Sequence, residues 1–304
     1  MIQNVTIAGL GALGGFMAGK LDGAPGVTVS AVADAACITR YRRDGVFLNG
    51  EPLQVTFLTP DEAMPADLLL IASKFTTLPE TIEAARGACG RDTIVMSLLN
   101  GVTSEEMIAD ALHPAHLLYT TAQGMATRKV GNRIDCSSRG SITFGTRDGA
   151  ENDDTATVAA LFDSIGYPYE VASDMLHRLY SKWMLNCGVN QTCAVHDVGY
   201  GGVHPGAPHR GEMIAAMEEA RTVANAAGIN LSEAERDHWV DVIDHLAADG
   251  EPSMRQDAKA GRPTEVALFG ETVCRMGADF GIATPVNAGF VRQLHEMEKS
   301  GQKK

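Results

Sequence analysis

The stretch NVTIAGLGALGG, residues 4–15, decides how this sequence is expected to fold. A short run of β-branched and apolar residues ends at a glycine, and G-x-G-x-x-G then opens a helical segment. In such a unit the first glycine permits a tight turn, the second lets a pyrophosphate approach the backbone, and the third lets helix and strand pack closely. A purely structural glycine turn is the alternative. The order of strand, loop and helix favours a dinucleotide-binding loop made of Gly9, Leu10, Gly11, Ala12, Leu13 and Gly14.

The next apolar run, VTVSAVAD, ends at Asp34, which lies 20 residues beyond Gly14. An acidic side chain at this distance can accept hydrogen bonds from the hydroxyl groups of an adenosine ribose and repel a 2′-phosphate. Alternatively, Asp34 caps the helix expected over AACITRYRR, because aspartate is a favoured N-cap residue. The two roles are compatible, so Asp34 is a candidate cofactor-binding residue.

Short β-branched runs alternate with helical segments through the first half of the chain. FLNGEPLQVTFL is typical of a hairpin, DLLLIAS and DTIVMSLLNG of buried strands, and the segment from HLLYTT to SITFGT of an antiparallel edge. This rhythm predicts an α/β Rossmann-type domain over residues 1–170, with a doubly wound, mainly parallel sheet. Almost unbroken helical periodicity predicts an all-helical domain over residues 171–304.

Charge and composition exclude several classes of partner. The 304 residues include 38 Asp and Glu against 25 Lys and Arg, which gives a formal net charge of −13. Such a balance disfavours binding to nucleic acid or to an anionic membrane surface. No apolar run approaches the ~20 residues of a membrane span, and the N-terminus lacks the pattern of a signal peptide. The six cysteines have no metal-like spacing and favour reduced thiols in a cytoplasmic protein.

The segment SKWMLNCGVNQTCAV, residues 181–195, carries a polar stripe on an otherwise apolar helix. Lys182, Asn186 and Asn190 stand four residues apart, so they share one side of the helix with a drift of roughly 40° per step. Lysine and asparagine are unfavourable in a core, whereas the flanking residues are unfavourable in solvent. The spacing alone does not decide between a solvent-facing stripe and one that lines a cleft.

Two polar residues follow the ends of expected strands. Lys74 comes directly after DLLLIAS, and Asn100 follows TIVMSLL. In open α/β sheets ligands bind beyond the carboxyl ends of the strands. Lys74 is therefore a candidate for a cofactor phosphate, and Asn100 for the nicotinamide ribose or the substrate. A surface lysine and a turn asparagine are the equally simple alternatives.

Six motifs, met in order along nearly the whole chain, resemble the ketopantoate reductase (2-dehydropantoate 2-reductase) family. They are GLGALGG, the lysine of IASKF, the LLNGV turn, the K-x3-N-x3-N helix, the PSM-x2-D…GR-x-TE segment and the late TPVN. That family joins a GxGxxG Rossmann domain to an all-helical C-terminal domain. The resemblance implies an NAD(P)-dependent oxidoreductase acting on a CH–OH group, with ketopantoate, a 2-oxo acid of pantothenate biosynthesis, as the default substrate.

The resemblance also implies roles for individual residues. Lys182 would be the catalytic lysine and Glu265 its carboxylate partner. Lys74 would lie near the cofactor phosphates, and Asn100 between cofactor and substrate. Three further residues would hold the substrate: Asn186, Asn190 and Ser253. The residue types suit the chemistry, because an ammonium group can stabilise a developing alkoxide and supply a proton.

The sequence departs from the family pattern in two places. Asp34 falls where NADPH-using members carry an arginine for the 2′-phosphate, so of NAD and NADP as cofactors, NAD is favoured. The segment 196–211, HDVGYGGVHPGAPHRG, is unusually rich in Gly, His and Pro. His204 and His209 suggest a metal, but the segment offers no carboxylate or cysteine at ligand spacing, so no metal site is expected. A loop that alters substrate choice is the simpler interpretation.

Alternatives remain open at the level of function. The first is a related reductase of another small 2-oxo acid. The second is a dinucleotide-binding sensor without turnover, although Lys182 together with Glu265 speaks against it, because a sensor needs no proton donor. The expected partner is a small 2-oxo acid rather than nucleic acid or a membrane, and the sequence leaves a homodimer open.

Overall fold

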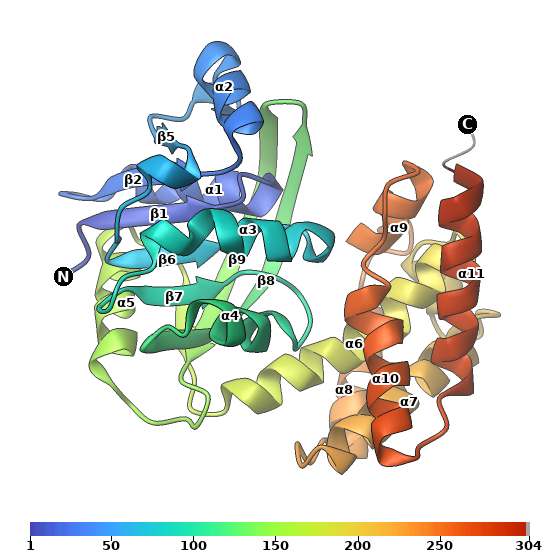
Figure 1. Cartoon of the computed structure of the whole chain (residues 1–304). Helices are drawn as coiled ribbons and strands as arrows, with labels where there is room; N and C mark the ends of the chain where they lie inside the picture. Colours follow the sequence, from blue (N-terminus) through green and yellow to red (C-terminus); the bar gives the residue numbers. More distant parts are fainter. Residues whose placement is uncertain (302–304) are drawn as a thin grey trace. The chain divides into compact units, whose positions relative to one another are not determined.

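A computed structural model describes residues 1–301 of the chain, which form two compact units (Figure 1). The first unit is Met1–Leu176 and the second begins at His177. The expected boundary lay six residues earlier, between residues 170 and 171. The difference arises because the chain after strand β10 (Tyr169–Val171) still packs on the first unit. There is no room for a side chain at Gly145, whose Cβ would overlap the carbonyl oxygen of Ala172 and lie 2.9 Å from the Met175 side chain.

The first unit contains one sheet in the order β4-β3-β9-β8-β7-β6-β1-β2-β5, with β10 added beside β9. Strands β5, β2, β1, β6, β7 and β8 are parallel neighbours, whereas β8 and β9 form a long antiparallel hairpin. The strands are β1 (Asn4–Ala8), β2 (Thr28–Val32), β3 (Phe47–Leu48), β4 (Glu51–Pro52), β5 (Thr56–Leu58), β6 (Leu68–Ile71), β7 (Ile94–Ser97), β8 (His116–Val130) and β9 (Arg133–Gly145). The sheet is thus the doubly wound, mainly parallel one expected from the sequence.

Helices cover both faces of this sheet, as Figure 1 shows for α3 and α4 in front of the strands. Helices α1 (Ala12–Leu21), α2 (Ala35–Asp44) and α5 (Asp153–Ser164) contribute to one apolar core. Helices α3 (Leu78–Ala85) and α4 (Ser104–Leu112) contribute to the core on the opposite face. Strands β6 and β7 are buried along their whole length, which explains their unbroken apolar sequence. Short 3-10 turns lie at Pro60–Glu62, Phe75–Thr77 and Arg86–Ala88.

The hairpin expected over FLNGEPLQVTFL is only partly formed. Strands β3 and β4 pair across a two-residue turn, in which Asn49 and Gly50 both have positive φ angles of 50° and 90°. An asparagine–glycine pair tolerates these angles and fits a tight hairpin. The remaining TFL does not join the hairpin. It forms β5, which instead extends the parallel sheet next to β2.

The second unit is built of helices, as expected. They are α6 (Met175–Val195), α7 (Arg210–Ala226), α8 (Glu233–Asp244), α9 (Ser253–Lys259), α10 (Thr272–Phe280) and α11 (Pro285–Gly301). A 3-10 turn at Tyr200–Val203 and a π-helical turn at Ala267–Glu271 connect them. Large buried side chains, among them Trp183, Phe269 and Phe290, fill its core. Trp183 donates a hydrogen bond from Nε1 to the carbonyl oxygen of Leu268, at 2.8 Å, which fixes α6 against the π-helical turn.

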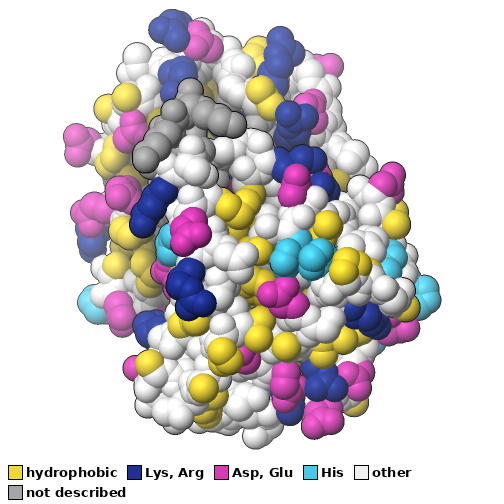
Figure 2. Space-filling view, turned by 90° about the vertical axis from the view of Figure 1, so that its right-hand side faces the viewer, with side chains coloured by type: hydrophobic (Ala, Val, Ile, Leu, Met, Phe, Trp, Pro, Cys, Tyr) yellow, Lys and Arg dark blue, Asp and Glu magenta, His cyan; other side chains and the backbone are white. Residues whose placement is uncertain are grey.

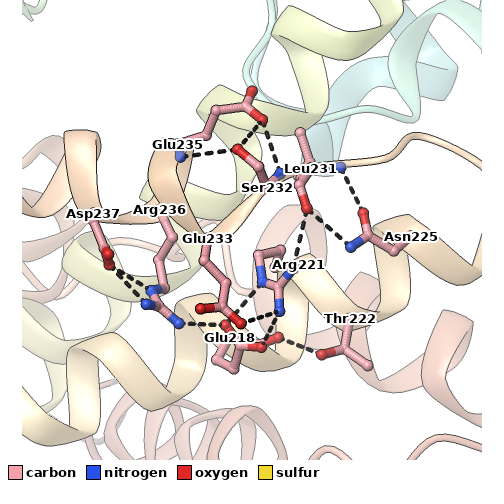
Figure 3. Close-up of polar contacts among 10 residues, drawn as sticks. All are labelled: Glu218, Arg221, Thr222, Asn225, Leu231, Ser232, Glu233, Glu235, Arg236 and Asp237. Carbon is pink, nitrogen blue, oxygen red and sulfur yellow. Dashed lines mark hydrogen bonds and ion pairs between the residues drawn. The ribbon is translucent and has the colours of Figure 1, made fainter.

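Charged and capping contacts fix the corner between α7 and α8 (Figure 3). Glu218 on α7 accepts hydrogen bonds from Arg221 on the same helix and from Arg236 on α8. Ser232 caps α8 and exchanges hydrogen bonds with Glu235 in a capping box. Because Glu218 binds guanidinium groups from two helices, it fixes the angle between α7 and α8. The capping box supplies hydrogen-bond partners for the backbone N–H groups at the start of α8.

Surface charges of both signs are interspersed on the face drawn in Figure 2, and no basic patch covers it. Among residues 1–301, no helix is both long and apolar enough to cross a membrane.

Candidate active site

The glycine loop between β1 and α1 has the geometry that its pattern predicts at two of three positions. Gly9 has a φ of 95°, and a Cβ there would lie 2.9 Å from the carbonyl oxygen of Ala72. A Cβ on Gly14 would overlap the carbonyl oxygen of Gly9. Both glycines are therefore required by the chain itself, the first for the turn and the second for the close packing of α1.

Gly11 differs from its two neighbours in the pattern. Its φ of −68° is accessible to any residue, and a Cβ would meet only the Ala72 carbonyl oxygen at an ordinary 3.5 Å. Nothing in the described chain therefore requires glycine at this position. Gly11 is the N-cap of α1, where free backbone N–H groups and the helix dipole favour an anion. Open space in front of a helix N-terminus is what a pyrophosphate needs.

Lys129, on β8, reaches the same loop and was not foreseen from the sequence. Its ammonium group donates a hydrogen bond to the carbonyl oxygen of Leu10. It also lies 3.2 Å from the Tyr41 hydroxyl and 4.9 Å from the centre of the Tyr41 ring. Because 119 residues separate Lys129 from Leu10, no local pattern could predict the contact.

Asp34 caps helix α2, as one of its two expected roles requires. Its Oδ1 accepts a hydrogen bond from the backbone N–H of Cys37 at 2.9 Å. Hydrogen bonds from Cys37 lower the pKa of Asp34, with a smaller contribution from the charge of Arg40. The side chain is exposed and negatively charged, and it lies just after the carboxyl end of β2.

Polar groups follow the ends of β6 and β7, and one lies within β8. Lys74 follows β6 and precedes a 3-10 turn, and Asn100 lies in the turn after β7. Three buried hydroxyl groups in this region have no hydrogen-bond partner within the described chain: those of Ser73, Thr103 and Thr121. Buried polar groups in proteins are nearly always hydrogen-bonded. Hydroxyl groups left over at the carboxyl edge of an open sheet fit a bound polar ligand there.

A buried carboxyl group lies behind this edge. Glu105 is 1% exposed, and its burial raises the pKa to about 7. Its Oε2 accepts a hydrogen bond from Ser104, whose hydroxyl in turn accepts one from Ser97 at the end of β7. No pattern in the sequence marks Glu105, because a glutamate in the first turn of a helix is ordinarily solvated and interacts favourably with the helix dipole.

In the second unit, the polar stripe on α6 turns out to be largely buried. Asn186 is 8% exposed and Asn190 is 6% exposed, while Lys182 is partly exposed. The two asparagines therefore do not face bulk water, whereas Lys182 keeps partial access to it. Gln191, which follows the stripe, donates hydrogen bonds to the carbonyl oxygen of Cys187 and to Oδ1 of Asn287.

Lys182 and Glu265 are brought together electrostatically. Burial lowers the pKa of Lys182 to about 8, and the charge of Glu265 acts in the opposite direction. Glu265 is 9% exposed and comes just before the π-helical turn at Ala267–Glu271. Such π-helical turns are rare and occur often at functional sites. The pair thus consists of a lysine that can lose its proton near neutral pH and a buried carboxylate that opposes this loss.

Ser253 begins helix α9 and is exposed. The loop that leads from it to Glu265 is closed by an ion pair, because Arg262 donates to Asp257 at 2.8 Å and the Asp257 side chain is only 8% exposed. The D…GR spacing of the sequence motif therefore has a structural role in this loop. Ser253, Glu265 and the α6 stripe all belong to the second unit, whereas the glycine loop and the strand-end residues belong to the first.

The TPVN motif also proves to be structural. Asn287 is fully buried and donates from Nδ2 to Glu219 at 2.8 Å and to the carbonyl oxygen of Ala216 at 3.1 Å. Glu219 accepts the backbone N–H groups of Val286 and Asn287 as well. With the bond from Gln191, this network joins α6, α7 and α11.

Both halves of the chain match profiles of one family. The profile described as "Ketopantoate reductase PanE/ApbA" matches residues 5–149, and "Ketopantoate reductase PanE/ApbA C terminal" matches residues 174–298. A 2-dehydropantoate 2-reductase of Vibrio cholerae is 29% identical, with 99% of this chain and 100% of the relative covered. That of Halobacterium salinarum is 28% identical, with 99% of each chain covered.

Solved structures give the same result. A PanE/ApbA family ketopantoate reductase from Ralstonia eutropha has a TM-score of 0.86 at 25% identity, covering 98% of this chain and 99% of that one. A D-mandelate dehydrogenase in a ternary complex with NADH and anilino(oxo)acetate has the same fold, with a TM-score of 0.86 at 21% identity and the same coverage. The chain therefore belongs to the ketopantoate reductase family of nicotinamide-dependent oxidoreductases that act on a CH–OH group.

Proposed function

We propose that this protein reduces a 2-oxo acid, with ketopantoate as the first candidate substrate and pantoate as its product. The observation that carries the proposal is the pairing of Lys182 with Glu265 beside two buried asparagines on α6. Family membership supports the reaction class, and relatives at 28–29% identity are named 2-dehydropantoate 2-reductase. The substrate and the role of each residue are our inference.

The first unit offers a fit for a nicotinamide dinucleotide. We assign the pyrophosphate to the N-terminus of α1, where Gly11 leaves space and the backbone N–H groups of Ala12, Leu13 and Gly14 are available. Lys129 would add a positive charge beside the same loop. Lys74 and Asn100 would contact the cofactor at the carboxyl edge of the sheet, near the unpartnered hydroxyl groups described above. When bound in its reduced form, this cofactor supplies a hydride.

Lys182 would handle the proton. Reduction of the C2 carbonyl group leaves negative charge on its oxygen, and an ammonium group stabilises that charge and then donates its proton. Glu265 would keep Lys182 protonated against the effect of burial. Asn186, Asn190 and Ser253 would bind the carboxylate and hydroxyl groups of the substrate, because amide and hydroxyl groups both donate and accept hydrogen bonds.

Cofactor preference follows from charge. The negative Asp34 at the end of β2 would accept hydrogen bonds from the ribose hydroxyls and repel a 2′-phosphate, which favours NADH over NADPH. Lys129 and Arg40 both approach the Tyr41 ring and would moderate this repulsion. We therefore expect a preference for NADH rather than absolute exclusion of NADPH.

The decisive assay follows NADH and NADPH oxidation side by side, with ketopantoate and a panel of small branched, hydroxylated and aromatic 2-oxo acids. Turnover with ketopantoate supports the proposal, and turnover confined to another 2-oxo acid would assign a related reductase instead. Cofactor binding without turnover on any substrate would identify a sensor.

Substitution of the proposed proton donor tests its role directly. Lys182→Met should lower kcat by on the order of 10²-fold while cofactor binding persists. Lys299→Met, a change at an exposed lysine on α11, is the matched control.

We further infer a cytoplasmic homodimer. All six cysteines are free, which suits a reducing compartment. A Staphylococcus aureus ketopantoate reductase with this fold is described as dimeric, at 17% identity and a TM-score of 0.78. Light scattering on the purified protein tests the oligomeric state directly, and a monomeric mass would refute the dimer.

A further inference from the structure

Two histidines and a glutamate meet in the second unit, and none of them is among the residues assigned above. His196 follows the last residue of α6, His209 is the N-cap of α7, and Glu212 lies in the first turn of α7. One ligand-type atom from each of the three side chains lies within 4.8 Å of the other two. We propose that His196, His209 and Glu212 bind a divalent transition-metal ion of the zinc type.

The residues come together because of the fold, not because of their spacing. His209 and Glu212 stand three residues apart at the start of a helix, so they share one face of α7. His196 directly follows the end of α6, and its Nε2 lies 2.5 Å from Oε2 of Glu212. The expectation of no metal site assumed that the segment 196–211 lacks a carboxylate at ligand spacing. Glu212 lies one residue beyond that segment and supplies the carboxylate.

His204, the other histidine that drew attention in the sequence, is not part of the cluster. Its Nε2 lies 3.1 Å from the carbonyl oxygen of Ile243 and fixes the loop to the end of α8. The structure thus separates a histidine with a structural contact from two that face a carboxylate. This difference makes His204 a suitable internal control.

The chemistry of the three groups selects the ion. Imidazole nitrogen with one carboxylate suits zinc, nickel, copper or ferrous iron, whereas magnesium and calcium prefer oxygen ligands throughout. Both His196 and Glu212 are partly accessible, at 24% and 37% of their side chains, so an ion can enter and keep an open position for water.

Binding requires a small rearrangement. The rings of His196 and His209 are stacked, with centroids 3.7 Å apart and an angle of 14° between their planes. Stacked rings do not direct their in-plane lone pairs at one point, so one ring must rotate. Ligand atoms of a tetrahedral zinc ion lie roughly 3.4 Å apart, so Nε2 of His196 and Oε2 of Glu212, now 2.5 Å apart, must also separate slightly. The ion would take the place of the proton between His196 and Glu212 and would join the end of α6 to the start of α7.

The test uses the full-length protein, free of any affinity tag, and titrates it with Zn²⁺ by calorimetry and with Co²⁺ by visible absorption. We expect one equivalent to bind saturably, with the intense d–d bands of a four-coordinate Co²⁺ site. His209→Gln should weaken binding by about 100-fold, while His204→Gln should leave it unchanged. Circular dichroism verifies that each variant is folded, and Glu212→Gln replaces His209→Gln if that variant is not.

Three results would overturn the proposal. The first is the absence of saturable binding to the wild-type protein. The second is binding of equal strength in the His209→Gln and wild-type proteins. The third is equal loss in the His204→Gln and His209→Gln variants, because the ion would then depend on another part of the unit. Zn²⁺ should also raise the melting temperature of the wild-type protein and not that of His209→Gln, since a ligand stabilises only the state that binds it.

Discussion

Lys182 experiences two opposing effects, burial that lowers its pKa and the charge of Glu265 that raises it, and together they leave the pKa at about 8. A lysine that donates a proton during reduction must be protonated, so kcat/KM should be level below about pH 8. Above that value it should fall by about tenfold per pH unit, because the protonated fraction falls in this way. Measuring kcat/KM for reduction between pH 6 and 10 checks the position of the break.

Glu265 provides the control for this pH profile. Glu265→Gln removes the charge that holds the proton on Lys182, so the pKa of Lys182 should fall and the break should move to lower pH. Loss of activity without a shift would assign Glu265 a structural role. A wild-type profile that stays level beyond pH 10 would remove Lys182 from the proton-transfer step.

Asp34 combines a structural contact with a charge, and two substitutions separate them. Asp34→Asn keeps an oxygen for the backbone N–H of Cys37 but removes the charge, whereas Asp34→Arg reverses the charge and removes the cap. The ratio of kcat/KM for NADPH to that for NADH should rise roughly tenfold in the first variant and further in the second. An unchanged ratio in Asp34→Asn, together with normal stability, would leave Asp34 as a helix cap alone.

At the scale of elements, Asn287 joins three helices through side-chain hydrogen bonds with Gln191 and Glu219. Asn287→Leu leaves the fully buried Gln191 amide without this partner and removes one hydrogen bond from the half-buried Glu219 carboxylate, so the free energy of unfolding should fall by about 3 kcal/mol. Urea denaturation at constant slope measures this change. Gln293→Ala, at an exposed site on the same helix, should change it by less than about 0.5 kcal/mol. Equal effects of the two substitutions would contradict the importance of the network.

Elements whose sequence pattern is local could be predicted, and contacts between distant elements could not. The glycine loop, the buried strands β6 and β7 and the helix of Lys182, Asn186 and Asn190 all follow from spacing within about 15 residues. Lys129 at the glycine loop and Glu212 beside His196 depend on how hairpins and helices pack. No periodicity encodes such a contact, so the sequence could not identify either residue.

At the scale of the whole molecule, the candidate cofactor-binding residues and the candidate catalytic residues lie in different units. The glycine loop, Asp34, Lys74 and Asn100 lie in the first unit, and Lys182, Glu265 and Ser253 in the second. The sequence predicted the change from α/β to helical texture but placed it at residue 170. The last residues of the first unit are part of helix α6, and a helix shared by two units gives no break in periodicity at the boundary.

A cofactor that binds the first unit alone should stabilise the protein even when the second unit cannot turn over. NADH at 100 times its Kd should add about 2.7 kcal/mol, which raises the melting temperature by roughly 4 °C for a chain of this size. Lys182→Met should keep this increase, since Lys182 belongs to the other unit. Gly11→Ala should lose most of it, because the added Cβ occupies space that the chain leaves open in front of α1.

Gly14→Ala separates this effect from simple damage to the loop. Its Cβ would overlap the Gly9 carbonyl oxygen, so the variant should melt at a lower temperature even without NADH. Gly11→Ala should melt within a few degrees of the wild type when no cofactor is present, because its backbone angles and contacts accept alanine. Differential scanning fluorimetry with and without NADH measures both quantities. A full NADH-dependent increase in Gly11→Ala would show that the pyrophosphate does not bind at the helix N-terminus, and would move the cofactor away from the loop.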